Sequence, residues 1–295
     1  MTVGFLLTSL LGLLWAAVGI TVALARRRNC PIWHFYTAGS GGAAFLCWIW
    51  WSFDPVGSGA IPRLLLFTAP AAIFNALGQA LTMYNLKSSG RALAFALPQT
   101  NFIFPFLYAG IFLGGVFNVL NVTGLALITA AILCSGQRET ENGSRRALLS
   151  FRELGLGVAA AVIVGMGQIF LLYAADTGGD APPILKSALI LTVSTAVYGT
   201  GAWIDRRRPR RLKFRSLRYG LLWSIAATLS YYVLFCSIAV MAESNRSGVV
   251  FALAGSMTIV LFWLFSALKL RDRVSKRQIA ILLLILAGIV TIRLG

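Results

Sequence analysis

The side chains that could bind a ligand are few and lie inside long apolar stretches. Asn75 and Gln79 are four residues apart in one stretch, so a helix would place both on the same face. Gln99 and Asn101 follow Pro98 in another stretch. A proline frees a backbone carbonyl in a helix, and amides beside such a carbonyl suit an uncharged polyol or a polar metabolite.

Aromatic residues and one more amide extend this set of candidate substrate-binding residues. Gln168 lies in the middle of an apolar stretch, and Trp15 lies near the middle of the first one. Tyr231 and Tyr232 are adjacent in the apolar stretch at 219–241. Aromatic faces next to amides suit stacking on a sugar ring or a flat metabolite. The alternative is hydrogen bonding between helices, which Asn and Gln commonly provide in membrane bundles.

Two ionisable residues, His34 and Lys186, lie within apolar stretches, each about one turn from an end. Lys186 could contact an anionic substrate or form part of an outer gate. A lysine so close to a helix end can also extend to the membrane interface, and we favour this interpretation. His34 could titrate near neutral pH, although an interface histidine with satisfied hydrogen bonds is the alternative.

The sequence offers no group of residues typical of a metal site or a catalytic centre. It has a single histidine, and all nine acidic residues lie in loops or at the ends of apolar stretches. The four cysteines show no paired spacing. We therefore expect no metal, no cofactor and no enzymatic activity.

The elements that carry these residues are predicted to be transmembrane helices. The chain is 58% hydrophobic and 12% charged, and a bilayer core of about 30 Å requires about 20 apolar residues per helix. Ten runs meet this length, near residues 3–25, 31–52, 62–86, 92–114, 117–136, 154–174, 183–204, 219–241, 247–268 and 278–294.

Basic residues are distributed unevenly between the loops that join these runs. The 26 Lys and Arg residues lie in every second loop, with four exceptions, Arg63, Lys186, Arg246 and Arg293. Lys and Arg collect on the cytoplasmic side of short loops, so we expect both termini outside, in a multi-pass protein of a bacterial inner (plasma) membrane. The net charge of +17 then reflects topology, and the expected partner is the lipid bilayer and no nucleic acid.

The chain contains an internal repeat. Residues 95–97 (FAL) recur at 251–253, and both copies begin a similar apolar run. Five helices per copy is an odd number, so the second copy would be inverted in the membrane. We predict an all-α membrane protein with a first five-helix repeat at 1–136, a cytoplasmic linker at 137–153 and a second, inverted repeat at 154–295. Inverted repeats are typical of secondary transporters.

Residues 74–80 (FNALGQA) and 90–98 (GRALAFALP), with residues 12–15 (GLLW), carry a family resemblance. With the five-plus-five layout, they resemble the drug/metabolite transporter superfamily, in its EamA-like ten-helix type. The nearest pattern is the bacterial glucose/ribose porter and rhamnose transporter branch. The resemblance implies a central cavity lined by the first four helices of each half. No carboxylate lies mid-way along the first helix, unlike in small multidrug members, which argues against proton-driven cation export.

The favoured function is secondary transport of a small polar, sugar-like metabolite by alternating access. Export of amino acids or other metabolites is an alternative, and so is a membrane enzyme that acts on a lipid-linked substrate. If transport is coupled to a proton, His34 or the acids Asp176 and Glu243 must carry it. We expect a monomer or a homodimer.

Overall fold

The computed structural model describes residues 2–28, 30–89, 97–115, 118–135, 151–177, 181–205, 214–269 and 276–294. These residues form helices and short connections and contain no strand. The elements are α1 (Thr2–Arg27), α2 (Ile32–Ser52), η1 (Ser58–Ala60), α3 (Ile61–Ser89), η2 (Leu97–Phe102), α5 (Ile103–Phe112), α6 (Val119–Ser135), α7 (Phe151–Thr177), α8 (Pro183–Asp205), α9 (Phe214–Ala242), α10 (Val249–Lys269) and α11 (Lys276–Leu294).

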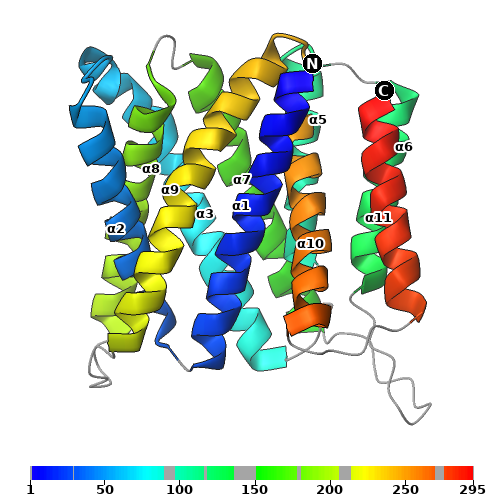
Figure 1. Cartoon of the computed structure of the whole chain (residues 1–295), viewed down its shortest axis with the longest axis horizontal. Helices are drawn as coiled ribbons and strands as arrows, with labels where there is room; N and C mark the ends of the chain where they lie inside the picture. The colour runs from blue at the N-terminus through cyan, green and yellow to red at the C-terminus, as the bar shows by residue number, and fades with distance from the viewer. Residues whose placement is uncertain are drawn as a thin grey trace.

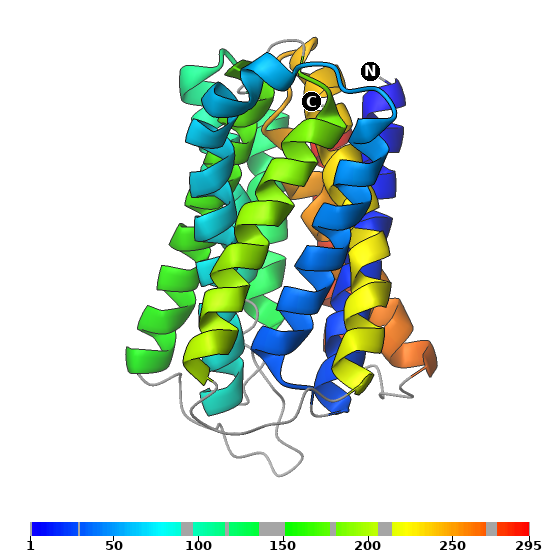
Figure 2. The same cartoon turned by 90° about the vertical axis from the view of Figure 1, so that its left-hand side faces the viewer.

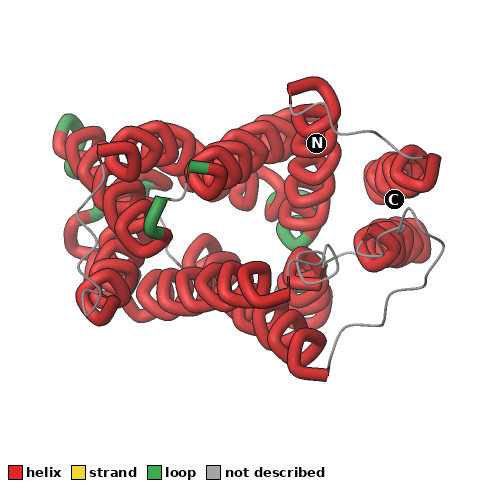
Figure 3. The backbone as a smooth tube through the Cα atoms, turned by 90° about the horizontal axis from the view of Figure 1, so that it is seen from below, coloured by secondary structure: helices red, strands yellow, loops and turns green. Residues whose placement is uncertain are grey.

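The helices stand side by side in one bundle, and both ends of the chain lie at the same end of it (Figure 1). α3 packs against α7 and α8, α2 packs against α8 and α9, and α1 packs against α9 and α10. α6 and α11 pair with each other at one edge of the bundle (Figures 1 and 3). At the opposite edge, α2 and α8 lie next to each other (Figure 2).

The lengths and surfaces of the helices are those of a membrane-embedded protein. Of the described residues, five helices are long and apolar enough to cross a membrane, and four shorter helices are also apolar. α2 belongs to neither group, because its Trp, Gly and Ser residues lower its mean hydropathy. Large apolar side chains such as Phe45, Leu66 and Leu283 are exposed on the outer surface, where lipid would cover them.

The helix expected at 92–114 has a different form from the others. Residues 90–96 lie outside the part of the chain that the structure describes, and residues 97–102 form the 3₁₀ helix η2 before α5 begins. Pro98 and Pro105 each lack the N–H that an α-helix needs, which explains the short 3₁₀ segment between them. The Asn101 side-chain amide donates a hydrogen bond to the Pro98 carbonyl at 2.8 Å.

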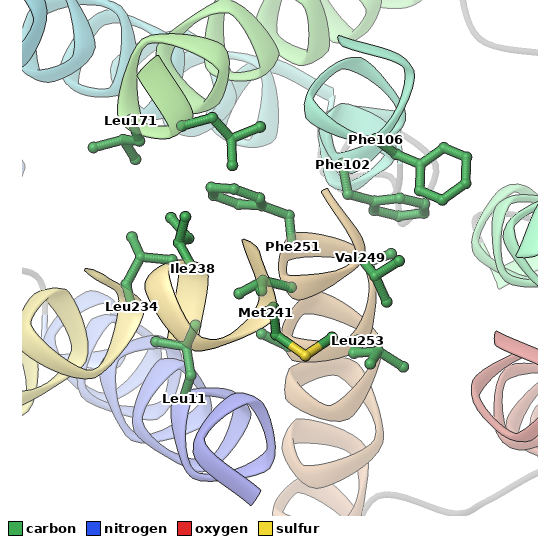
Figure 4. Close-up of a cluster of buried hydrophobic side chains, with 14 of the residues drawn as sticks. Leu11, Phe102, Phe106, Leu171, Leu234, Ile238, Met241, Val249, Phe251 and Leu253 are labelled. Atoms are coloured by element: carbon green, nitrogen blue, oxygen red, sulfur yellow. The ribbon is translucent and has the colours of Figure 1, made fainter. Parts of the chain in front are cut away.

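Apolar side chains from several helices form the core. Figure 4 shows Phe251 extending from α10 toward Leu171 of α7, with Ile238 of α9 beside it. All three are buried, and Phe251 is only 1% exposed. A second cluster lies between α2, α8 and α9 and includes Phe35 and Trp223. Burial of such large side chains stabilises each by about 1.5–3 kcal/mol relative to water.

The pair α6 and α11 is held by close contact of small residues. A Cβ added at Gly124 would lie 2.7 Å from the Gly288 carbonyl oxygen. Such an approach of two backbones is possible only where neither residue has a side chain. The two helices can therefore pack tightly against each other.

Candidate functional site

Aromatic rings and one amide from four helices meet in the bundle. The Tyr198 hydroxyl on α8 donates a hydrogen bond to Gln79 Oε1 on α3 at 2.9 Å. The Tyr36 ring on α2 is stacked on the Tyr198 ring, with centroids 4.9 Å apart and an angle of 16° between the planes. Trp33 lies 6.3 Å from Tyr198, and Trp223 on α9 lies 5.9 Å from Tyr36. We call these five residues the aromatic–amide cluster.

Glycines allow the helices that carry this cluster to approach each other. A Cβ added at Gly39 of α2 would come within 2.7 Å of the Trp223 ring, and one at Gly220 of α9 would come within 3.2 Å of the Gly39 nitrogen. These small residues leave room for the large rings between α2 and α9. The positions of the rings therefore depend on the glycines opposite them.

The cluster still has unused hydrogen-bonding capacity. Gln79 accepts one bond through Oε1, and its side-chain amide makes no bond to another described residue. Trp223 is buried, and its Nε1 has no hydrogen-bond partner. A buried N–H without a partner is unfavourable by about 1–3 kcal/mol. Aromatic faces beside free amide and indole N–H groups can hold a polar ring-shaped solute.

Asn75 and Gln168 lie deeper in the bundle, between α3 and α7. Asn75 Nδ2 donates to the Ala71 carbonyl at 3.0 Å in its own helix, and a Cβ at Gly167 would lie 2.9 Å from that same nitrogen. The neighbouring Gln168 is buried, and its Oε1 accepts no hydrogen bond. Asn75 therefore packs at a helix contact, whereas Gln168 retains a free acceptor.

The other predicted substrate-binding residues do not gather in one place. Trp15 on α1 faces Phe251 at 6.3 Å, and Tyr232 on α9 faces Trp50 on α2 at 4.8 Å. Tyr231 is half-buried and packs against the two large apolar clusters. Asn101 and Gln99 belong to η2. The bond from Asn101 to the Pro98 carbonyl means that this amide is engaged within η2 itself.

Two of the predicted residues need separate comment. The Gln99 side chain lies outside what the structure describes, so its predicted role is unchanged. His34 is half-buried in the first turn of α2 and forms no hydrogen bond with a described residue. Its predicted part in proton coupling stays a prediction.

Lys186 is buried among protein groups, whereas the favoured sequence interpretation has it extend to the membrane interface. Its side chain is 6% exposed, and Nζ donates to the Ala175 carbonyl of α7 at 3.3 Å. The same nitrogen lies 5.9 Å from the centroid of the Phe235 ring of α9. The side chain thus extends from α8 toward the last turn of α7 and toward α9.

Sequence reasoning missed Trp33, Tyr36, Tyr198 and Trp223. Each lies in a predicted helix among many other aromatic residues, and no spacing distinguishes it. Their partnership depends on the packing of α2 against α8 and α9. Some polar groups within the helices have a structural role, as the Thr228 hydroxyl shows by donating to the Ala43 carbonyl of α2 at 3.3 Å. In the described residues no group of His, Cys, Asp and Glu side chains could hold a metal ion.

Comparison with known proteins establishes the fold. No family model and no curated protein matches the sequence. Solved structures do match, and one of them, described as "Crystal structure of protein", has a TM-score of 0.77 over 100% of this chain and 97% of the other, at 13% sequence identity. At this identity the likeness defines an all-helical bundle shared over the full length, and nothing of the activity.

Proposed function

We propose that this chain is a secondary transporter of the drug/metabolite type, which moves a small polar solute by alternating access. The observation that carries the proposal is the pattern of helix packing. In transporters built from two repeats, the substrate site lies between the repeats, and transport is a rocking of one against the other.

The packing pattern is nearly unchanged when the two halves are exchanged. The exchange replaces α1 by α7, α2 by α8, α3 by α9, α5 by α10 and α6 by α11. It converts the contact of α1 with α9 into that of α7 with α3, and the contact of α2 with α9 into that of α8 with α3. It also converts α1 with α10 into α7 with α5, and it maps the pairs α2–α8 and α6–α11 onto themselves. A two-fold relation between residues 1–136 and 154–295 accounts for all these contacts.

This two-fold relation supports the proposed topology. Exchanged helices run in opposite directions if each half holds five spans, so the halves are inverted with respect to each other. The basic loops then lie on the cytoplasmic side of a bacterial inner membrane, and both termini lie outside. The position of both chain ends at one end of the bundle agrees with an even number of spans (Figure 1).

The proposed solute is sugar-like. The aromatic–amide cluster places the stacked rings of Tyr36 and Tyr198 beside the amide of Gln79. A sugar has an apolar ring face and hydroxyls at its edge, so it matches both kinds of group. Gln168 supplies a further free acceptor toward the middle of the bundle.

Uptake into proteoliposomes tests the proposal. Purified protein should catalyse saturable uptake of at least one solute from a panel of neutral sugars, sugar acids, amino acids and cations, measured with and without a pH gradient. Gln79→Ala should lower that uptake by about tenfold or more, because it removes the amide of the cluster. Thr291→Val on α11 is the control, since the Thr291 hydroxyl bonds only within its own helix. Failure of every solute to enter would overturn the proposal.

A further inference from the structure

Lys186 is a buried cation in the first turn of α8. Its side chain is 6% exposed and lies between the Ala175 carbonyl of α7 and the Phe235 ring of α9. Lys186 is part of a helix that is long and apolar enough to cross a membrane. An ionisable side chain in such a place is expensive to bury and usually has a partner or a function.

The protein groups around the ammonium only partly compensate for its burial. An ammonium has three N–H donors, and the Ala175 carbonyl accepts one of them at the long distance of 3.3 Å. The face of Phe235, 5.9 Å away, adds a cation–π attraction. The amino end of a helix carries partial positive charge, so α8 itself disfavours a cation in its first turn. Two N–H donors and most of the charge remain available to another group.

No carboxylate of the described residues pairs with this cation. The acid nearest in sequence to the Ala175 carbonyl is Asp176, which is exposed and forms no ion pair with Lys186 within 4.0 Å. The other described acidic residues form no ion pair with Lys186 either. Asp176 attracts the ammonium at longer range, and two of the N–H donors of the ammonium have no partner among the described residues.

We infer that the transported solute carries an anionic group and that Lys186 binds it, which rests on the proposed transport function. A carboxylate fits best, because one ammonium can neutralise one negative charge, whereas a phosphate dianion would leave a charge uncompensated. The substrate class narrows from polar sugar-like solutes to sugar acids and similar carboxylated metabolites.

Lys186 and the aromatic–amide cluster act at different depths. Both Lys186 and Tyr198 belong to α8, and twelve residues of helix separate them by about 18 Å. A small solute cannot touch both at once. Lys186 recognises the charged group while the solute lies at the end of the bundle that holds the chain termini, and the cluster contacts the solute only after it has moved further along.

Binding to the purified protein in detergent tests the inference separately from transport. The probes are D-glucuronate, D-glucose and D-glucose 6-phosphate, which share a ring and differ in charge, and the readout is isothermal titration calorimetry. The wild type should bind glucuronate more tightly than glucose. Lys186→Gln should weaken glucuronate binding by about tenfold or more and change glucose binding by less than about twofold, and Lys186→Arg should restore part of the glucuronate affinity.

A matched control separates the site from a general loss of charge. Arg293 of α11 is exposed and also lies 5.9 Å from an aromatic ring, that of Phe5. Arg293→Gln therefore removes one positive charge and one cation–π contact and should leave all three affinities unchanged. Monodisperse elution and an unchanged melting temperature of Lys186→Gln would show that the variant folds.

The outcomes distinguish the two proposals. Equal binding of glucose and glucuronate, or equal glucuronate binding by Lys186→Gln and the wild type, would overturn the inference whether or not uptake occurs. Loss of glucuronate binding in Asp176→Asn as well would also overturn it, because Lys186 would then act through that acid. Tighter binding of glucose 6-phosphate than of glucuronate would refute the carboxylate assignment. Lysine-dependent binding without any uptake would support the anion site and refute the transporter.

Discussion

Replacing Tyr198 by phenylalanine tests the aromatic–amide cluster most directly. The substitution removes the hydroxyl that donates to Gln79 Oε1 at 2.9 Å and keeps the ring that is stacked on Tyr36. Only the hydrogen bond between α3 and α8 is lost. The change therefore isolates one interaction in a site where several rings pack together.

The expected loss of stability follows from the geometry of this bond. Hydrogen bonds between membrane helices contribute about 0.6 kcal/mol on average and at most about 1.7 kcal/mol. The bond from Tyr198 is short, joins two different helices and is partly buried, so we expect Tyr198→Phe to lower the free energy of unfolding by about 1 kcal/mol. Because the Gln79 side chain is only half-buried, the loss should be smaller than that for a fully buried acceptor.

A double-mutant cycle measures the bond itself. Tyr198→Phe, Gln79→Leu and the double variant are unfolded with SDS in mixed micelles, and the coupling energy between the two sites should be about 0.6–1.7 kcal/mol. Tyr108→Phe on α5 is the control, because the Tyr108 ring contacts Phe112 and Tyr173 and belongs to neither partner of the bond between Tyr198 and Gln79. A coupling energy within error of zero would refute the reasoning, since the hydroxyl and the amide would then not stabilise each other.

Two further predictions concern the helix packing and the topology. Gly39→Leu should lower the melting temperature, because even a Cβ at this position would lie 2.7 Å from the Trp223 ring and overpacking destabilises by about 1–3 kcal/mol. Gly59→Ala is the control and should leave the melting temperature unchanged, because nothing lies within 4 Å of a Cβ added there. Equal melting temperatures of the two variants would contradict the close contact of α2 and α9. A cysteine placed at Val3, which is 61% exposed, should react with a membrane-impermeant maleimide on intact cells, whereas one at the exposed Arg28 should react only after permeabilisation. The reverse pattern would refute the proposed orientation.

The helices could be predicted from the sequence because their determinants are local. The run expected at 183–204 agrees with α8 at Pro183–Asp205, and the run at 278–294 agrees with α11 at Lys276–Leu294. Apolar length alone decides such a helix in a bilayer. The exception is the helix expected at 92–114, where the prolines at 98 and 105 produce the 3₁₀ segment η2 in the described part. The sequence contained the prolines, but it did not specify how the backbone would respond.

The candidate site was less predictable. Gln79 was expected as a substrate-binding residue, yet its partner Tyr198 was not, because 119 residues separate them and only the packing of α3 against α8 joins them. Lys186 was recognised as unusual, but its burial was not foreseen. A lysine near a helix end can extend either to the interface or inward, and the neighbouring helices decide between these.

Lys186 therefore shows which properties of this protein the sequence determines and which depend on the tertiary structure. The amino-acid sequence by itself placed one ammonium within an apolar helix, and it fixed the all-helical class of the chain, since both follow from residue types along a short segment. Only the tertiary structure decided that the ammonium lies between Ala175 and Phe235. The physical reason is that burial, unlike helix formation, depends on side chains that are distant in sequence and meet only when α7, α8 and α9 pack together.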